Sequence, residues 1–424
     1  MSDSTTSLII LAVIIFFFVT EKIPLPLTAI LGMLAMSFSG ILTWPQAFSG
    51  FASTSVLMII GVCVVGAAFF TTGLSSKVGG FLSRVSGNDG KKFSFAVSAL
   101  SSVMGIFFNA TTVTALMMPI IDSVSQQSEG KVIRRYSYMP MAVGSIYGAT
   151  LTAFSATSNV TASGLLAASE LGRGLKPFEP FLIILPGVVF LLLFMLFGGY
   201  NYVQKVFKFE ENPITAPTGK KETVEYNPVK ARIYIIVVIA MMVAMTFTSI
   251  NLAALFFLAG AVLILTNCID FKSAVNSVSW PVFLLIGGAI GFAKGLEVSG
   301  AGLTIAEFVI NVAGPLANSQ FAMCVIMLVV CTFISNFMSN NAAVVIVMPI
   351  ALGIAQSMGA SYIPFALATA VGSNLSISTP VATPSTSLIY SLGYRFMDYI
   401  KFGGLINVIG TVGAAFALKV LYFM

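Results

Sequence analysis

Two stretches of the sequence decide how the chain is organised, because each is a version of the other. The first is "FFNATTVTALMMPI", residues 107–120, and the second is "FMSNNAAVVIVMPI", residues 337–350. "ILTWPQAFSGFASTSVLMIIG" (41–61) similarly parallels "CIDFKSAVNSVSWPVFLLIGG" (268–288). Matching stretches lie 222 to 230 residues apart, so the sequence predicts two copies of one unit.

The composition places both copies in a lipid bilayer. Of the 424 residues, 57% are hydrophobic and only 8% are charged. Apolar stretches long enough to span a membrane recur from Leu8 to Phe423, which leaves no room for a soluble catalytic domain. The first stretch, from Leu8 to Val19, lacks a basic start and a small-residue cleavage site, so we expect a retained helix rather than a signal peptide. The fold class we expect is an all-α polytopic membrane protein.

Several kinds of chemistry are excluded or disfavoured by what the chain lacks. It has no His, which argues against zinc sites and Ser/His/Asp triads, and no acid pair lies inside an apolar run. The cysteines stand at irregular spacings in or beside apolar runs and are expected to be small buried hydrophobes: Cys63, Cys268, Cys324 and Cys331. The net charge of +6 is spread over short loops, so no nucleic-acid partner is expected. We expect no enzyme activity.

One long polar segment, residues 205–232, divides the chain into a first unit (1–204) and a second unit (233–424). We expect about five spans in each unit, plus a re-entrant hairpin at about 93–122 and about 320–352. A broken helix is expected to follow each hairpin, at about 138–165 and about 363–390. Because an odd number of spans inverts the second unit, the two copies are predicted to be inverted repeats, which are typical of secondary transporters.

The distribution of basic residues supports this topology. With the linker 205–232 in the cytoplasm, seventeen Lys and Arg residues fall on the cytoplasmic side. Only four fall outside: Arg173, Lys176, Lys294 and Lys419. We therefore expect ten spans in the cell (inner) membrane, with both termini outside.

The start of the second hairpin holds an unusual polar cluster: Ser335, Asn336, Ser339, Asn340 and Asn341. Such side chains can simply join helices by hydrogen bonds. The donor and acceptor groups of the Asn amides, however, need hydrogen-bond partners, which lipid does not provide. If the hairpin tip is broken near the midplane, its oxygens suit Na⁺, whereas the exposed helix N-terminus suits an anion.

A second interrupted stretch, "SNLSISTPVATPSTSLIY", runs from Ser373 to Tyr390. We expect breaks at Thr379-Pro380 and at Thr383-Pro384, because proline frees the carbonyls of the preceding turn. Those carbonyls need hydrogen-bond donors or a bound ion. The alternative is a kinked helix whose freed carbonyls are satisfied by Ser and Thr.

At this point the sequence resembles a known family. "SNNAAVVIVMP" is similar to the Ser-Asn-Thr hairpin signature of the divalent-anion:sodium symporter family, and "PVATPS" to the Pro-Val-Ala-Thr-Pro-Pro stretch that follows it. "FFVTEKIPLPLTAIL" (17–31), "AKGLEVSG" (293–300) and "FGGLINVIG" (402–410) extend the resemblance over nearly the whole chain. It implies an elevator-type Na⁺-coupled carrier that is usually a homodimer. Typical members have an additional first helix, which we expect this chain to lack.

The resemblance also implies site residues. A Na⁺ site in the second unit would comprise Ser335, Ser339, Asn340 and the backbone at Ala382; the substrate would contact Asn340, Asn341, Thr383 and Pro384. In the first unit the signature positions are Asn109, Ala110 and Thr111, Gly105 stands opposite Ser335, and Ser155 takes the backbone-ligand position. The first Na⁺ site, around Asn109 and Ser155, is therefore expected to be weakened, rebuilt or lost. Asn109 and Thr111 would contact the substrate.

The leading functional hypothesis is symport of a small anion with Na⁺. Candidate anions are sulfate and di- or tricarboxylates such as succinate, malate and citrate. A Na⁺-independent anion exchanger or efflux carrier is the alternative, because Ala110 replaces the amide that would bind ion and substrate. A channel-like pore fits less well, since the sequence shows no charged rings. Coupling to protons is disfavoured, because no Asp or Glu lies near the predicted midplane.

Overall fold

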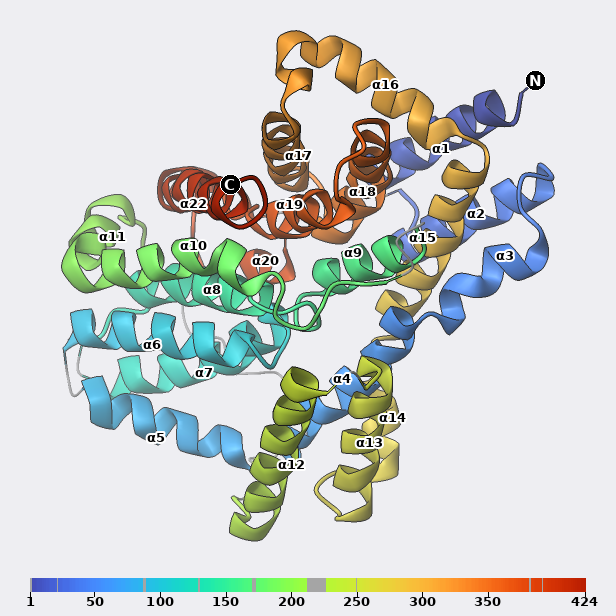
Figure 1. Cartoon of the computed structure of the whole chain (residues 1–424). Coiled ribbons are helices and arrows are strands. Elements are labelled where there is room, and N and C mark those ends of the chain that lie inside the picture. The colour runs from blue at the N-terminus through green and yellow to red at the C-terminus, as the bar shows by residue number, and fades with distance from the viewer. Residues whose placement is uncertain are drawn as a thin grey trace.

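Helices account for all the regular structure in the part of the chain described here. The computed structural model describes residues 2–424 except 21, 87–88, 129, 170–172, 212–225, 249, 381–382 and 391. Figure 1 shows helices crossing one another in several layers, and no strand is found among the described residues. Among the same residues, six helices are long and apolar enough to cross a membrane: Trp44–Thr71, Phe181–Val206, Pro228–Met245, Trp280–Val298, Asn340–Ser357 and Phe396–Tyr422. The expected all-helical, multi-pass class is confirmed.

The described part of the chain begins with five helices and a 3₁₀ turn. These are α1 (Asp3–Thr20), α2 (Leu25–Phe38), α3 (Trp44–Phe48), the 3₁₀ turn η1 (Ser49–Ala52), α4 (Thr54–Thr71) and α5 (Leu74–Ser86). Pro24 precedes α2, where its fixed φ suits a helix start and its missing N–H costs nothing. Ser53 caps α4 by accepting a hydrogen bond from the Val56 N–H at 3.3 Å.

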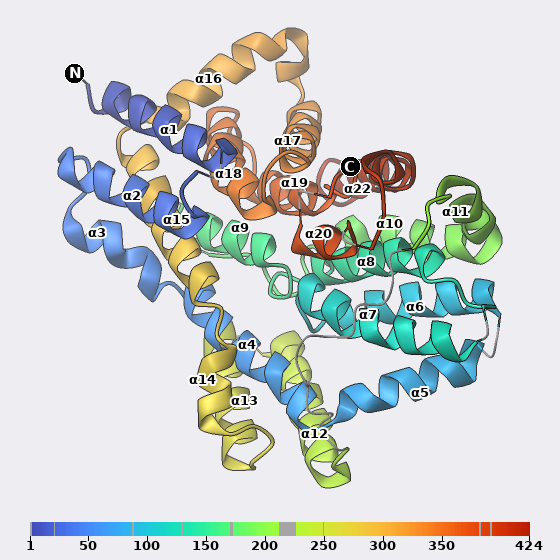
Figure 2. The same ribbon diagram turned by 180° about the vertical axis from the view of Figure 1, so that it is seen from behind.

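The rest of the first half contains a helical hairpin and an interrupted helix. Its helices are α6 (Gly90–Gly105), α7 (Ala110–Gln127), α8 (Arg135–Thr150), α9 (Thr157–Ala167), α10 (Phe181–Phe194), the π-helical turn η2 (Met195–Gly199) and α11 (Tyr200–Val206). Seen from behind, α6, α7 and α8 lie side by side (Figure 2). The chain is not helical between Thr150 and Thr157, so the two parts of the interrupted helix are α8 and α9.

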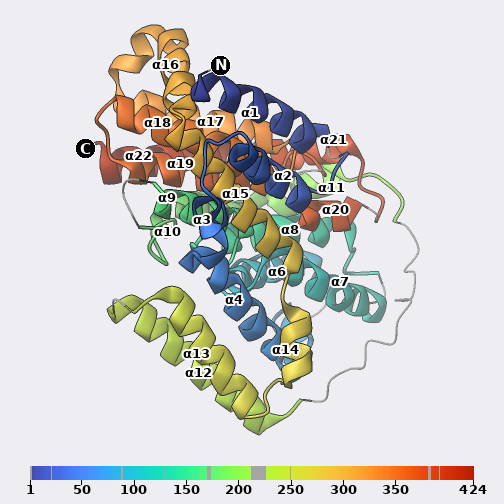
Figure 3. The ribbon, with the colours of Figure 1, turned by 90° about the vertical axis from the view of Figure 1, so that its right-hand side faces the viewer.

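The second half also contains a helical hairpin and an interrupted helix. Its helices are α12 (Pro228–Phe247), α13 (Leu252–Leu265), α14 (Phe271–Ser277), α15 (Trp280–Val298), α16 (Ala301–Ala313), η3 (Gly314–Asn318), α17 (Gln320–Ser335), α18 (Asn340–Ser357), α19 (Tyr362–Asn374), α20 (Pro384–Tyr390), α21 (Phe396–Asp398), the π-helical η4 (Tyr399–Gly403) and α22 (Gly404–Tyr422). The hairpin here is α17–α18, and the interrupted helix is α19–α20. Figure 3 shows α12 and α13 as a pair set apart from both hairpins, with α13 packed on α4.

The interruption in the second half begins earlier than the prolines predicted. Helix α19 ends at Asn374, whereas we expected the first break at Thr379-Pro380. Asn336, in the hairpin turn, explains the difference. Its Oδ1 accepts the Ser378 N–H at 3.0 Å, and its carbonyl accepts the Thr379 hydroxyl at 2.5 Å. These bonds hold residues 378–379 against the hairpin and replace the helical bonds they would otherwise make.

Glycines let the first hairpin approach its interrupted helix very closely. A Cβ added at Gly148 would lie 2.1 Å from the Ser102 carbonyl oxygen, and one at Gly144 would lie 2.6 Å from the Ser98 carbonyl oxygen. At Gly105 an added Cβ would lie 2.6 Å from the Ala149 nitrogen. Backbone therefore packs directly on backbone between α6 and α8, as small residues allow in membrane proteins.

Helix α9 brings the two halves together. It packs against α18 and α19 of the second half, and it also contacts α4 and α15. Most of its residues are buried. Since α9 begins where the first interrupted helix resumes, this contact places both helix interruptions near the middle of the molecule.

Candidate functional site

A cavity of about 540 Å³ lies between the two hairpins and the two helix interruptions. Eight of the residues expected at the site line it: Asn109, Thr111, Ser155, Ser339, Asn340, Asn341, Thr383 and Pro384. Ser335 is fully buried beside it and contacts Asn340. Ala382 lies outside the described residues. The cavity therefore gathers side chains from positions more than 270 residues apart, Asn109 and Thr383 among them.

Several helices begin at the wall of this cavity. Asn109 caps α7 by accepting the Thr111 N–H at 3.0 Å, and Ser339 caps α18 by accepting the Ala342 N–H at 3.3 Å. The first residues of α9, including Thr157, also line the wall. Helix N-termini carry partial positive charge, and none of the described residues of the lining is Asp, Glu, Lys, Arg or His. The helix starts therefore give the cavity a potential that favours an anion.

A cluster of oxygen atoms lies where the second hairpin meets the second interruption. We call Ser335 Oγ, Asn340 Oδ1, the Ser373 carbonyl oxygen and Ser376 Oγ the oxygen cluster. Ser335 Oγ lies 2.8 Å from Asn340 Oδ1, 2.8 Å from the Ser373 oxygen and 3.1 Å from Ser376 Oγ. Ser376 Oγ lies 2.8 Å from Asn340 Oδ1 and 2.7 Å from the Ser373 oxygen.

The oxygen cluster has fewer protons than contacts. Its five oxygen–oxygen contacts share only two hydroxyl protons, those of Ser335 and Ser376. Asn340 adds none, because its Nδ2 donates to Asn374 Oδ1 at 3.4 Å and so turns its Oδ1 towards the hydroxyls. Helices α17 and α19 end at this point, and their C-termini carry partial negative charge. Hard oxygens that lack protons suit a small cation such as Na⁺.

At the corresponding place in the first half, the number of donor protons matches the number of hydrogen bonds. Ser155 Oγ donates to the Ile106 carbonyl at 2.6 Å, and Thr152 Oγ1 donates to the same carbonyl at 3.4 Å. Asn109 Nδ2 donates to the Ser155 carbonyl at 3.4 Å. Each donor therefore has its own proton to give. No side chain fits at Gly105, the position that matches Ser335, because a Cβ there would meet backbone atoms of α8.

Hydrogen bonds cross between the halves at the wall of the cavity. Asn341 Nδ2 donates to Thr157 Oγ1 at 3.1 Å, and Thr161 Oγ1 donates to Asn341 Oδ1 at 3.1 Å. The amide of Asn341 is thus held against α9. We expected Asn341 to contact substrate, and the structure gives it these partners within the protein as well.

Sequence reasoning missed part of the site. The missed residues are Thr157, Ser158, Asn159, Ser373, Asn374 and Ser376, of which Thr157, Ser158 and Asn374 line the cavity. Ser373, Asn374 and Ser376 stand in the quoted stretch that begins at Ser373, but the prolines farther along drew the prediction to Thr379 and Thr383. Two hydroxyl residues and one amide residue lie within four positions just before those prolines. This concentration of polar side chains was the sequence signal that could have identified them.

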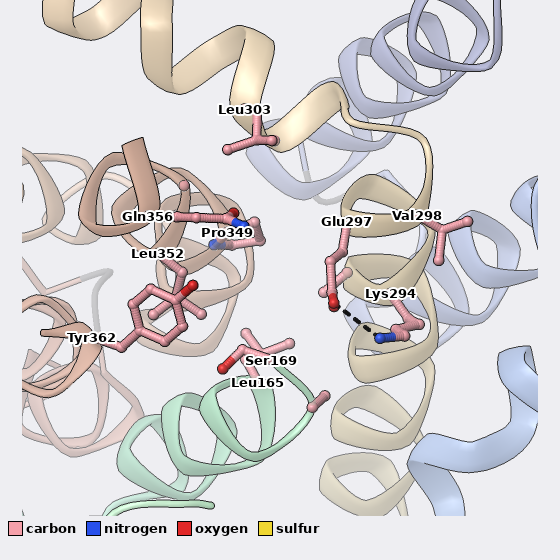
Figure 4. Close-up of a pocket in the computed structure, with 14 residues that line it drawn as sticks. Leu165, Ser169, Lys294, Glu297, Val298, Leu303, Pro349, Leu352, Gln356 and Tyr362 are labelled. Atoms are coloured by element: carbon pink, nitrogen blue, oxygen red, sulfur yellow. Dashed lines mark hydrogen bonds and ion pairs between the residues drawn. The ribbon is translucent and has the colours of Figure 1, made fainter. Parts of the chain in front are cut away.

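A second cavity, of about 260 Å³, contains the Lys294–Glu297 ion pair (Figure 4). Lys294 Nζ lies 3.0 Å from Glu297 Oε1, and both side chains are partly exposed near the end of α15. Gln356 and Tyr362 lie on the opposite wall, with Leu303 above (Figure 4). Because the two charges neutralise each other and remain in contact with solvent, this cavity provides a weaker anion site than the helix starts do.

Comparisons with known proteins agree with this architecture. The crystal structure of the YdaH transporter from Alcanivorax borkumensis superposes with a TM-score of 0.66 at 13% identity, covering 89% of this chain and 87% of that one. The structure of MtrF from Neisseria gonorrhoeae gives a TM-score of 0.62 at 13% identity, over 89% of this chain and 82% of that one. At such identities the likeness concerns the fold alone.

Relatives in sequence are transporters. An uncharacterized transporter of Haemophilus influenzae is 24% identical over 98% of this chain and 92% of its own length. The uncharacterized transporter YfbS of Escherichia coli is 34% identical, but over only 32% of this chain and 22% of its own length. Human Na(+)/dicarboxylate cotransporter 3 is 29% identical over 36% of this chain and 25% of its own length. The chain thus matches about a quarter of the length of these last two relatives.

The family model described as the citrate transporter family, CitMHS, matches residues 15–372 and again residues 315–424. The matched regions cover most of the chain. Together with the Na(+)/dicarboxylate cotransporters among the relatives, they confirm the resemblance to the divalent-anion:sodium symporters. The chain belongs to the citrate transporter family and is a membrane transporter.

Proposed function

We propose that the protein is a secondary active transporter that carries a small anion together with Na⁺. The observation that carries this proposal is the proton-poor oxygen cluster, which shares Asn340 with a cavity lined by helix N-termini. In this proposal the side chain of Asn340 belongs to both the cation site and the anion site. The substrate class is a di- or tricarboxylate, such as succinate, malate or citrate, or sulfate.

Each site has its own ligands in this proposal. Na⁺ binds Ser335, Asn340, Ser376 and the Ser373 carbonyl, with Ser339 and the backbone at Ala382 as further ligands from the family resemblance. The anion binds at the starts of α7, α9 and α18. Its side-chain contacts are Asn109, Thr111, Asn340, Asn341, Thr383 and Pro384. Asn109 and Ser155 mark the weaker cation position of the first half.

Proximity explains why transport of the two ions is coupled. The cavity wall adjoins the oxygen cluster through Asn340, whose side chain is buried. Opposite charges attract more strongly in such a place than in water, so bound Na⁺ raises the affinity for the anion and the anion raises the affinity for Na⁺. An anion alone would have to leave water without a counter-charge, because the described lining offers no Lys or Arg.

The proposed movement is that of an elevator carrier. In it, residues 1–204 and 233–424 are inverted repeats joined by a cytoplasmic linker at 205–232, and both termini lie outside the cell membrane. The hairpins and interrupted helices, which pack on one another, form the moving unit. Helices α2 and α15, and α4 and α13, pack on each other instead and support a fixed scaffold. In this proposal the scaffold joins two copies into a homodimer.

Exchange or efflux without Na⁺ is the second candidate function. The first-half position favours it, because the oxygens there have matching protons and no need of a cation. The shared fold with MtrF, which is linked to a class of antimetabolite efflux pumps, is compatible with this alternative. The oxygen cluster of the second half favours symport.

Uptake into proteoliposomes separates the candidates. Purified protein is reconstituted, and accumulation of labelled succinate, citrate and sulfate is followed with an inward Na⁺ gradient or with choline in place of Na⁺. Accumulation of one anion only with Na⁺ is the expected result. Equal flux in both conditions that requires an anion inside would establish exchange and refute the symport proposal.

A further inference from the structure

Three buried amides form a continuous chain between the two halves. We call Asn340, Asn374 and Asn159 the amide chain. Asn340 Nδ2 donates to Asn374 Oδ1 at 3.4 Å, and Asn374 Nδ2 donates to Asn159 Oδ1 at 3.0 Å. Asn159 Nδ2 then donates to the carbonyls of Thr150 at 3.2 Å and Thr152 at 2.7 Å. The amide chain therefore runs from the oxygen cluster to the interruption between α8 and α9.

Every amide in this chain has a fixed direction. The exposed fractions of these residues are 8% for Asn340, 4% for Asn374 and 0% for Asn159, so their amides depend mainly on partners within the protein. Asn374 Nδ2 also donates to the Ala370 carbonyl at 2.9 Å, and its Oδ1 accepts from Ser158 Oγ at 2.9 Å. Turning the amide of Asn374 or Asn159 over would place oxygen against oxygen and nitrogen against nitrogen, and turning that of Asn340 over would place its oxygen against Asn374 Oδ1. The two amide-to-amide bonds consequently both run in one direction, with the donors pointing from Asn340 through Asn374 to Asn159.

Asn374 also holds the start of α9, where the anion site lies. Ser158 and Asn159, its two partners on that side, belong to the first turn of α9. Ser158 lines the cavity. The position of Asn374 therefore affects how the N–H groups of α9 face the cavity.

We propose that Asn374 and Asn159 are positioning residues that couple Na⁺ in the oxygen cluster to the anion site at the start of α9. The inference rests on the proposed symport. Na⁺ held by Asn340 Oδ1 polarises that amide and makes its Nδ2 a stronger donor. The link from Asn340 to Asn374, at 3.4 Å, is the longer of the two amide-to-amide bonds and has more room to shorten than the other, at 3.0 Å. Shortening draws Asn374 and, through it, the first turn of α9 towards the geometry that binds the anion.

The test measures Na⁺ binding and its effect on the anion separately. Asn374→Ala is compared with the wild-type protein by binding of radiolabelled Na⁺ without anion. Binding of whichever of succinate, citrate and sulfate the wild type accumulates is then measured at low and high Na⁺. We expect Na⁺ affinity to stay within about threefold, whereas the Na⁺-induced gain in anion affinity falls at least about tenfold. A purely structural role would lower both affinities together and would overturn the inference.

Further variants separate coupling from folding. Asn159→Ala should lose the same coupling, and the double variant should be no worse than either single one, because residues in one chain are not additive. Asn374→Ser keeps a shorter donor and acceptor, and provides the comparison if the alanine variant does not fold; intermediate coupling is expected. Thr369→Val is the matched control, because its buried hydroxyl only donates to the Phe365 carbonyl at 3.0 Å, one turn earlier on α19.

The outcomes distinguish the two proposals. If the wild-type protein binds none of the three anions better with Na⁺, the proposed symport fails and the coupling role fails with it. If the wild type shows the effect of Na⁺ and Asn374→Ala retains it in full, only the coupling role is refuted.

Discussion

The ends of the two hairpins have the same helical outline and different chemistry. At the end of α17, Ser335 inserts a hydroxyl among the oxygens of α18 and the second interruption. At the end of α6, Gly105 stands in that place and lets α6 lie against the backbone of α8. The comparison teaches that close backbone packing and a side-chain hydroxyl exclude each other at this position. Two hairpins of similar outline can therefore differ in the polar groups at their ends.

The largest expected effect comes from Asn340→Ala. The substitution removes an oxygen from the cluster and a contact from the anion cavity, so Na⁺-driven uptake should fall at least about a hundredfold, which corresponds to about 2.8 kcal/mol. Uptake of labelled anion into proteoliposomes checks it. Thr266→Val, at the C-terminal cap of the remote helix α13, serves as the control and should transport normally. Near-normal uptake by the Asn340 variant would show that the site lies elsewhere.

Paired hydroxyl deletions should show the asymmetry between the halves. Ser335→Ala removes one of the two protons and one of the oxygens of the cluster, and should raise the Na⁺ concentration for half-maximal uptake at least about tenfold. Ser155→Ala removes one donor from a site in which each hydrogen bond has its own proton. It should raise the Na⁺ concentration for half-maximal uptake less than about threefold. The Na⁺ dependence of uptake at fixed anion measures both. Equal effects would mean that both halves bind Na⁺ alike.

Gly105→Ser tests whether packing forbids the hydroxyl in the first half. Its Cβ would lie 2.6 Å from the Ala149 nitrogen and 2.7 Å from the Ser145 oxygen. These are backbone atoms, which cannot move away by a change of rotamer as a side chain can. We expect a loss of about 1–3 kcal/mol of stability, seen as a lower unfolding temperature in detergent. Gly198→Ser is the control, since an added Cβ there meets nothing within 4 Å. A variant as stable as the control, with stronger Na⁺ dependence, would show that packing does not exclude a site.

The smallest effect is expected for Ala110→Asn. This change supplies the amide that the first signature lacks, but without the hydroxyl that Gly105 cannot provide. The Na⁺ concentration for half-maximal uptake should shift less than about threefold. A clear rise in the number of Na⁺ ions carried per anion would show that the amide alone rebuilds the first cation site.

The sequence predicted the helical membrane fold and the family, and both are confirmed. Long apolar runs leave a chain in lipid almost no choice but helices, since every backbone N–H and carbonyl must be satisfied within the segment. The hairpin signatures predicted candidate residues such as Asn109 and Asn340, and the structure places both at one cavity.

The contacts that bring residues outside the signatures into the site could not be predicted from the sequence. Ser376 is brought to Asn340 by the non-helical path of residues 375–380, and that path depends on contacts such as Asn336 with Ser378. Asn374 and Asn159 are 215 positions apart, and each alone resembles an ordinary polar residue in a packed helix. No periodicity in the sequence reports a hydrogen bond between them.

One feature of the cavity determines how the protein should respond to acidity. Its described lining holds no Asp, Glu, Lys or Arg, and the chain contains no His. The described lining of the cavity therefore has no side chain that normally gains or loses a proton near neutral pH. A carboxylic acid changes its own charge in that range, so the pH profile of uptake should follow the ionisation of the cargo. The pH dependence of uptake can then be used to identify which protonation state of the anion is carried.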